Sequence, residues 1–70
     1  SPKVTYQEYA TNIRKEYKHM SDEEFNAGRA SFITKIIEKE IIFQTEAFHD
    51  MFEETARENM RDELEQLTQK

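Results

Sequence analysis

The four residues from Ser21 to Glu24, Ser-Asp-Glu-Glu, constrain the fold most, because they mark a helix start. In a Ser-x-x-Glu capping box, the Ser and Glu side chains each bind a backbone N–H that the helix end leaves free. Met20 and Phe25 flank this box at the two positions of a hydrophobic staple. The carboxylates of the first turn also lie near the positive end of the helix dipole. The sequence therefore predicts a helix that begins at Asp22.

This helix is expected to span residues 22–38. Apolar residues recur along it at intervals of three and four, the pattern of a helix with one buried face. They are Phe25, Phe32, Ile33, Ile36 and Ile37. Gly28 lies inside the segment, where glycine costs about 1 kcal/mol relative to alanine. We therefore expect Gly28 to permit the close approach of another helix or of backbone; a glycine without a structural role is the alternative.

The end of this helix is marked less clearly. The polar stretch 38–40 contains neither proline nor glycine, and Ile33, Ile37 and Ile41 continue the helical spacing through it. Thr45 is suited to cap a further helix. We place the break at residues 39–44; the alternative is a helix that runs on to Phe43.

An earlier helix is predicted over residues 5–18. Thr5 and Glu8 have the spacing of a second capping box. Its apolar face consists of Tyr6, Tyr9, Ala10, Ile13 and Tyr17. These positions also follow the three-and-four spacing of one helical face.

A third helix is predicted over residues 46–68, with Thr45 as its cap and Glu46 in its first turn. Its apolar stripe, with Met51 beside it, consists of Phe48, Phe52, Ala56, Met60, Leu64 and Leu67. Two favourable i,i+4 ion pairs are expected on it: Glu53 with Arg57, and Arg61 with Glu65. The fold class that follows is all-α, a three-helix bundle or hairpin in a single segment, residues 1–70.

Composition limits the classes of function. The chain has 70 residues, no cysteine and a net charge of -5, with 36% charged residues. A domain of this length has a marginal core. The acidic balance argues against nucleic acid, which requires a basic surface. No apolar run approaches the roughly 20 residues that span a bilayer, and no signal peptide is recognisable. We therefore expect a cytoplasmic protein without a nucleic-acid or membrane partner.

Residues that could carry chemistry are few. His49 and Asp50 are adjacent, with His19 upstream and Asp62 downstream, which is the ligand order of HD-type metal phosphohydrolases. Asp62 lies three helical turns beyond Asp50, about 16 Å along the axis. That separation is too large for ligands of one ion. We therefore expect no catalytic residue, no metal site and no cofactor within this chain.

The tyrosines and the basic residues each have two interpretations. Tyr6, Tyr9 and Tyr17 have the spacing of core or interface residues, although aromatic rings can also stack on bases. The basic side chains could contact phosphates if the fold gathered them, or could be ordinary solvated charges. They are Arg14, Lys15, Lys18, Arg29, Lys35 and Arg57.

Four ordered motifs resemble one bacterial family. They are I-R-x-E-Y, then S-D-x-x-F-x-x-G-R, then I-F-x-T-x-x-F, and finally E-x-x-A-R-x-N-M-x-x-E-L. The matching residues are Ile13, Arg14, Glu16, Tyr17, Ser21, Asp22, Phe25, Gly28, Arg29, Ile42, Phe43, Thr45, Phe48, Glu53, Ala56, Arg57, Asn59, Met60, Glu63 and Leu64. The set resembles the predicted metal-dependent phosphohydrolases of the HD superfamily, over about residues 6–64.

The resemblance implies that this stretch is the C-terminal helical region of such an enzyme. The His and Asp ligands of its divalent metal would then precede Ser1, in a catalytic domain that this sequence does not contain. Arg14 and Arg29 would be the candidates for contacts with a substrate phosphate. Family members often have a proline just before the Ile-Phe pair, where this chain has Glu40 and Ile41.

Two classes of function follow. The chain is either the C-terminal helical part of an HD-type phosphohydrolase or an acidic helical module for interaction and oligomerisation. In both cases a homodimer is expected, because the chain has more large apolar side chains than a three-helix monomer covers easily. The side chains expected to form its apolar face are Ile33, Ile36, Ile37, Ile41, Ile42, Phe43, Phe48 and Phe52.

Overall fold

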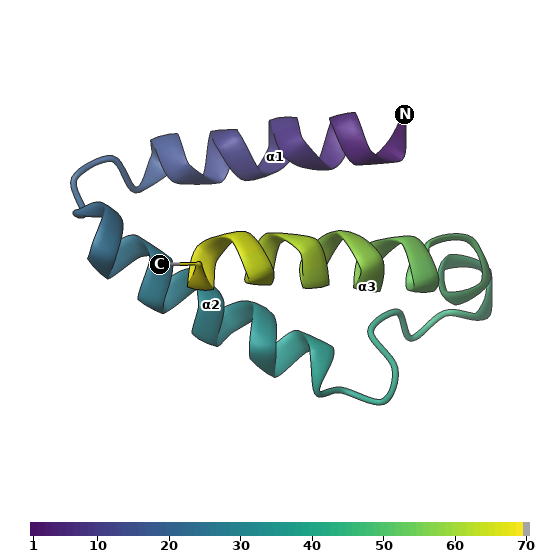
Figure 1. Cartoon of the computed structure of the whole chain (residues 1–70). Coiled ribbons are helices and arrows are strands. Elements are labelled where there is room, and N and C mark those ends of the chain that lie inside the picture. Colours follow the sequence, from purple (N-terminus) through teal and green to yellow (C-terminus); the bar gives the residue numbers. More distant parts are fainter. Residues whose placement is uncertain (70) are drawn as a thin grey trace.

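A computed structural model describes residues 1–69 and contains three α-helices, as Figure 1 shows. They are α1 (Pro2–Glu16), α2 (Asp22–Ile37) and α3 (Glu46–Thr68). The described residues include no strand. The all-α prediction is confirmed, and the bounds of α3 agree with those expected from the sequence.

The predicted start of α1 is wrong. The helix begins at Pro2, with Ser1 as its N-cap and a hydrogen bond of 3.5 Å from the backbone N–H of Val4 to Ser1 Oγ. Proline is well suited to the first helical turn, because its fixed φ is helical and its missing N–H would have no partner there. The backbone N–H of Thr5 already donates within the helix, to the carbonyl of Ser1. Thr5 therefore lies inside α1 and does not form a capping box with Glu8.

The predicted start of α2 is confirmed. The backbone N–H of Glu24 donates to Ser21 Oγ at 3.0 Å, and the backbone N–H of Ser21 donates to Glu24 Oε1 at 3.1 Å. The helix ends at Ile37, so the alternative of a helix that continues to Phe43 is wrong. Thr45 then caps α3 by accepting a hydrogen bond from the backbone N–H of Phe48.

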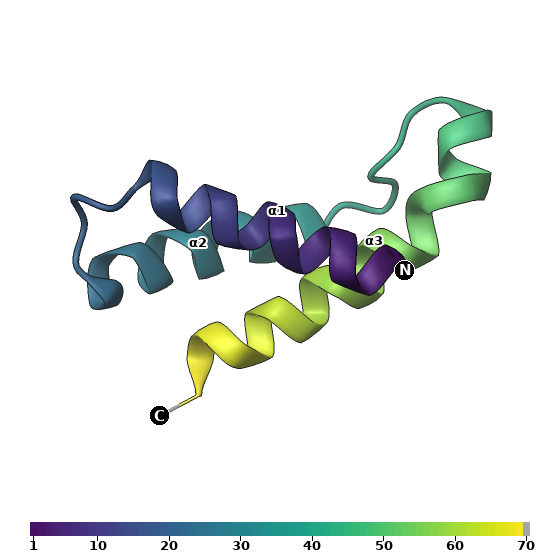
Figure 2. The same ribbon diagram turned by 90° about the horizontal axis from the view of Figure 1, so that it is seen from above.

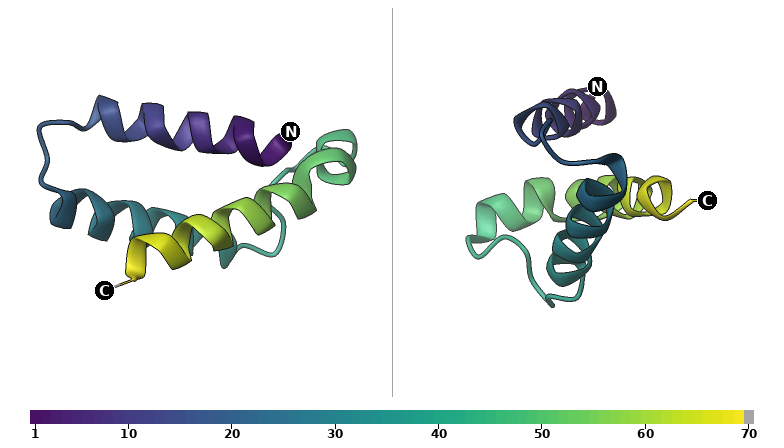
Figure 3. Two further views of the ribbon diagram at one scale, coloured as in Figure 1. Left: turned by 45° about the horizontal axis from the view of Figure 1, so that its top comes forward. Right: turned by 90° about the vertical axis from the view of Figure 1, so that its left-hand side faces the viewer.

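The three helices are arranged unevenly. Helix α3 packs mainly against α2, whereas α1 lies across α3 and contacts it less extensively. Figure 2 shows α1 crossing α3, and the end view in Figure 3 shows α1 standing apart from the other two. The buried apolar core lies between α2 and α3 and consists of Ile33, fully buried, and Phe25, 8% exposed.

The apolar faces that the sequence predicts are only partly covered. On α2, Ile36 and Ile37 are half-buried, but Phe32 is 52% exposed. No residue of α1 is buried. On α3, the stripe is half-buried from Ala56 onward and exposed at its start. The exposed side chains there are Phe48, Met51 and Phe52.

The expectation for Gly28 is also wrong within this chain. A Cβ atom added at Gly28 would meet no other atom within 4 Å. No helix or backbone of the same chain therefore uses the missing side chain.

The chain has more accessible surface than a compact monomer of its mass. Its surface is 5587 Å², compared with about 4600 Å² for a typical folded monomer of 8.4 kDa. Its radius of gyration is 12.8 Å, compared with about 11 Å for a compact domain of 70 residues. The loose placement of α1 leaves apolar side chains uncovered on two sides of the molecule.

Substitution distinguishes the cap at Ser21, which the structure contains, from the cap expected at Thr5, which it does not. Ser21→Ala should lower the free energy of unfolding by about 1 kcal/mol, because it removes the acceptor for the Glu24 N–H. Thr5→Ala is the matched control and should cost nothing, since alanine is favoured inside a helix. Urea denaturation followed by circular dichroism measures both. Equal losses for the two variants would contradict the observed start of α1.

Candidate functional site

A buried ion pair between Arg29 and Glu63 joins α2 to α3. Arg29 Nε lies 2.8 Å from Glu63 Oε2, and Arg29 Nη2 lies 3.1 Å from Glu63 Oε1. Two tyrosines of α1 complete this network: the Tyr6 hydroxyl donates to Glu63 Oε1, and the Tyr9 hydroxyl accepts from Arg29 Nη2 at 3.3 Å. The guanidinium also lies 5.3 Å and 5.5 Å from the ring centroids of Tyr9 and Phe32. The pair therefore connects all three helices.

The surroundings of this network set the protonation of its members. Burial raises the pKa of the Glu63 carboxyl, but the hydrogen bonds from Arg29 and Tyr6 outweigh burial and hold that pKa below its usual value. Burial and the hydrogen bond to Glu63 raise the pKa of the Tyr6 hydroxyl. Glu63 is therefore a carboxylate and Tyr6 a neutral donor at neutral pH.

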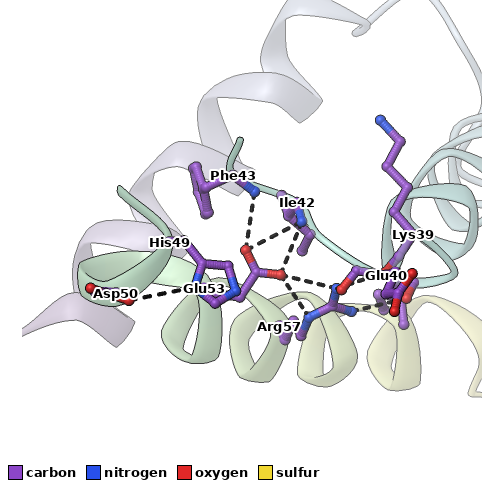
Figure 4. Close-up of polar contacts among 9 residues, drawn as sticks. Lys39, Glu40, Ile42, Phe43, His49, Asp50, Glu53 and Arg57 are labelled. Atoms are coloured by element: carbon purple, nitrogen blue, oxygen red, sulfur yellow. Dashed lines mark hydrogen bonds and ion pairs between the residues drawn. The ribbon is translucent and has the colours of Figure 1, made fainter. Parts of the chain in front are cut away.

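A second network fixes the connection between α2 and α3, as Figure 4 shows. The Glu53 carboxylate accepts from the backbone N–H groups of Ile42 and Phe43, both at 3.0 Å. Arg57 Nε donates to the same carboxylate at 3.0 Å, so the expected pair of Glu53 with Arg57 is confirmed. The other expected pair, Arg61 with Glu65, forms no ion pair in the described part of the chain.

The Arg57 guanidinium binds the carbonyl groups at the end of α2. It donates to the carbonyl oxygens of Ile37 at 3.0 Å, Lys39 at 2.7 Å and Glu40 at 3.1 Å. Burial raises the pKa of Glu53, but the donors from the loop and Arg57 outweigh it and lower that pKa. Together Glu53 and Arg57 hold the loop in place without the proline that the resembled family often has there.

Arg14 belongs to a third, separate network at the turn from α1 to α2. It donates to the carbonyl oxygens of Tyr17 at 2.8 Å and Met20 at 3.0 Å, and to Asp22 Oδ1 at 2.8 Å. Its guanidinium lies 4.8 Å from the ring centroid of Phe25. The two candidate phosphate contacts, Arg14 and Arg29, are therefore engaged with carboxylates and share no hydrogen-bond partner.

The His-Asp pattern is not gathered into one place. His49 Nδ1 lies 3.6 Å from Asp50 Oδ1. Asp62 instead pairs with Lys3 at 3.0 Å, and His19 lies beside the ring of Tyr17. Among residues 1–69, no group of three or more His, Cys, Asp or Glu side chains is placed to hold a metal ion.

An open apolar groove lies between the beginning of α1 and the beginning of α3. We call it the aromatic groove; its volume is about 700 Å³, and its main lining residues are Pro2, Tyr6, Phe43, Phe48, Phe52 and Ala56. The three phenylalanine rings form a cluster with centroid separations of 5.7–6.5 Å. The hydrogen bond from the backbone N–H of Phe43 to Glu53 ties this wall of the groove to α3.

A second groove lies between α1 and the outer side of α2. We call it the α2 groove; its volume is about 370 Å³, and its main lining residues are Tyr9, Tyr17, Met20, Gly28, Arg29 and Phe32. Arg29 Nη1 donates to no atom among the described residues. Since no fully buried side-chain nitrogen or oxygen lacks a partner in that range, Nη1 keeps some contact with solvent.

Sequence reasoning did not find the partner of Arg29. The available signal was the position of Glu63 between Met60, Leu64 and Leu67, on the side of α3 that packs inward. A carboxylate at such a position requires a buried cation or several hydrogen-bond donors.

Comparisons with models of protein families, with curated proteins and with solved structures find no match to this chain. Within residues 1–69, no helix combines the length and the apolar character needed to cross a membrane.

Acid should destabilise the fold through three carboxylates that accept hydrogen bonds in the folded chain. The pKa values of Glu24, Glu53 and Glu63 are lowered on folding, so their contribution is present above the unfolded pKa of about 4.5. It is lost as the pH falls through the lower folded values. Thermal midpoints should therefore be nearly constant from about pH 7 to pH 5 and fall below about pH 4.5.

Glu63→Gln identifies the share of this effect that belongs to the Arg29 pair. The variant should be less stable at pH 7 and should lose less stability than wild type on acidification. Glu8→Gln makes the same change of net charge on an exposed part of α1. A Glu63→Gln profile parallel to wild type would contradict the role given to this carboxylate.

Proposed function

We propose that this chain is the C-terminal helical part of a larger HD-type metal-dependent phosphohydrolase, in which it supports the catalytic helices without supplying metal ligands. The observation that carries the proposal is the aromatic groove, a preformed apolar surface that the chain itself leaves open. Its exposed rings, Phe48 at 55% and Phe52 at 44%, have the character of a domain interface without its partner.

The position of the groove supports this assignment. Ser1 and Pro2 lie at its rim. Polypeptide that precedes Ser1 would therefore emerge beside the groove and could pack into it without a long connection. The metal-bearing helices of the catalytic domain are the segment that we assign to this position.

The residues that carry the family resemblance give a second line of support. Six of them form the three polar networks of the structure: Arg14 with Asp22, Arg29 with Glu63, and Glu53 with Arg57. The residues that match the family therefore include those whose contacts define this three-helix arrangement. Among the described residues, these matching residues do not form a group suited to catalysis.

This function assigns a supporting role to both candidate arginines. Arg14 and Arg29 are neutralised by Asp22 and Glu63, so their first role is to hold α2 against its neighbours. Hydrolysis of a phosphate ester would take place in the catalytic domain, where a divalent metal activates water. We place the whole enzyme in the cytoplasm.

The proposal is tested on the natural protein that contains residues 1–70. Its upstream sequence should supply His and Asp metal ligands, and the protein should hydrolyse bis-p-nitrophenyl phosphate with Mn2+. Phe52→Asp should reduce this activity at least about tenfold, because a buried, unpaired charge would disrupt domain docking.

Met51→Asp is the matched control, since Met51 is adjacent, 68% exposed and outside the aromatic groove. It should retain wild-type activity. A natural protein without upstream metal ligands, or equal activities for the two variants, would reject the proposed function.

A further inference from the structure

The side of α2 that faces away from its buried residues is exposed along its length, and α1 borders part of it across the α2 groove. Exposed residues recur on it at helical spacing, namely Glu24, Gly28, Ser31, Phe32 and Lys35. Phe32 projects at 52% exposure, whereas four residues earlier the space beside Gly28 is empty. The same face therefore carries both an apolar projection and a recess.

The Arg29 side chain also lines this recess. The Arg29 side chain is only 7% exposed, and its Nε and Nη2 atoms are engaged by Glu63 and Tyr9. Its Nη1 atom donates to no atom among residues 1–69 and keeps some contact with solvent, because no fully buried side-chain nitrogen in that range lacks a partner. A polar atom of a partner would replace solvent as the acceptor for this donor.

The arrangement of charges matches a second copy of the same helix. In an antiparallel crossing centred between Arg29 and Ala30, residue 24 of one helix faces residue 35 of the other. Glu24 would then lie opposite Lys35 of the partner subunit, and the reverse pair would form by symmetry. The same crossing places Phe32 within one residue of the recess at Gly28 of the partner subunit. Self-complementarity of this kind is the requirement for a two-fold interface.

We propose that two copies of this chain associate through the outer faces of α2, antiparallel about a two-fold axis, with Phe32 of each copy seated beside Gly28 of the other. In this arrangement Gly28, which weakens a helix interior, has a structural role, because a side chain there would block the partner's ring. The inference is independent of the proposed function, since it uses the face opposite to the core and not the aromatic groove.

The exposed surface of the whole chain, which also includes the aromatic groove, is large enough for such an interface. The chain exposes about 1000 Å² more than a typical monomer of its mass. A standard interface removes about 800 Å² from each partner. Ile33, which the sequence suggested for a dimer face, is completely buried by α3 and is not available for it.

Sedimentation equilibrium of the full 70-residue chain over micromolar to millimolar concentrations tests the proposal. The wild type should show a monomer–dimer equilibrium. Gly28→Leu should raise the dissociation constant about thirtyfold, because Leu fills the recess that receives a central aromatic side chain. It should leave the monomer folded, since a Cβ at this position meets no atom within 4 Å. Circular dichroism of the dilute protein checks this.

Phe32→Ala and Phe48→Ala form a matched pair, because both remove a half-exposed phenylalanine from different faces. Phe32→Ala should weaken the dimer to a similar degree as Gly28→Leu, and Phe48→Ala should leave its dissociation constant unchanged. A wild-type monomer throughout the range would overturn the proposal. So would a dimer that tolerates Gly28→Leu, or one that is weakened by Phe48→Ala alone.

Discussion

The buried ion pair of Arg29 and Glu63 is the interaction on which the rest of the structure depends. With Ile33 and Phe25 as the buried apolar core, hydrophobic packing alone leaves the register of the helices weakly defined. The pair defines that register, because its geometry requires α2 and α3 to meet at one position. The removal of one member of a buried pair typically costs about 3–5 kcal/mol, since it leaves an uncompensated charge. That loss is a large fraction of the stability of any small domain.

The polar contacts of α1 explain why some apolar surfaces of the molecule remain uncovered. Helix α1 is attached through Tyr6, Tyr9 and Arg14 rather than through buried apolar residues, so it stands away from α2 and α3. The aromatic groove opens beside the beginning of α1 and the α2 groove beside its end, and Tyr9 lines both. Two faces held open by fixed contacts suit a part that receives neighbours, in our account a catalytic domain and a second copy.

The sequence predicted those features that local chemistry determines. The caps at Ser21 and Thr45 placed the starts of α2 and α3 correctly, because each cap acts within one helical turn. The start of α1 was missed because Thr5 also fits a capping pattern, and Pro2 with Ser1 forms the actual one. Helical spacing identified the pair of Glu53 with Arg57.

The long-range contacts could not be predicted in this way. Periodicity shows which side of a helix faces inward, but not which residue of another helix it meets. Arg29 and Glu63 are 34 residues apart, and Tyr6 and Glu63 are 57 apart. The backbone groups that bind Glu53 depend on the path of a loop that has no periodic pattern. The open space at Gly28 likewise requires the positions of all three helices.

A double-mutant cycle on Arg29→Met and Glu63→Gln, followed by urea denaturation at pH 7, tests the central claim most directly. A cycle on the exposed pair Lys3 and Asp62 serves as the reference. We predict a coupling energy of about 2 kcal/mol or more between Arg29 and Glu63. For the exposed pair we predict a coupling energy of at most about 0.5 kcal/mol. Equal and small couplings for the two pairs would contradict the claim that the buried pair sets the arrangement of the helices.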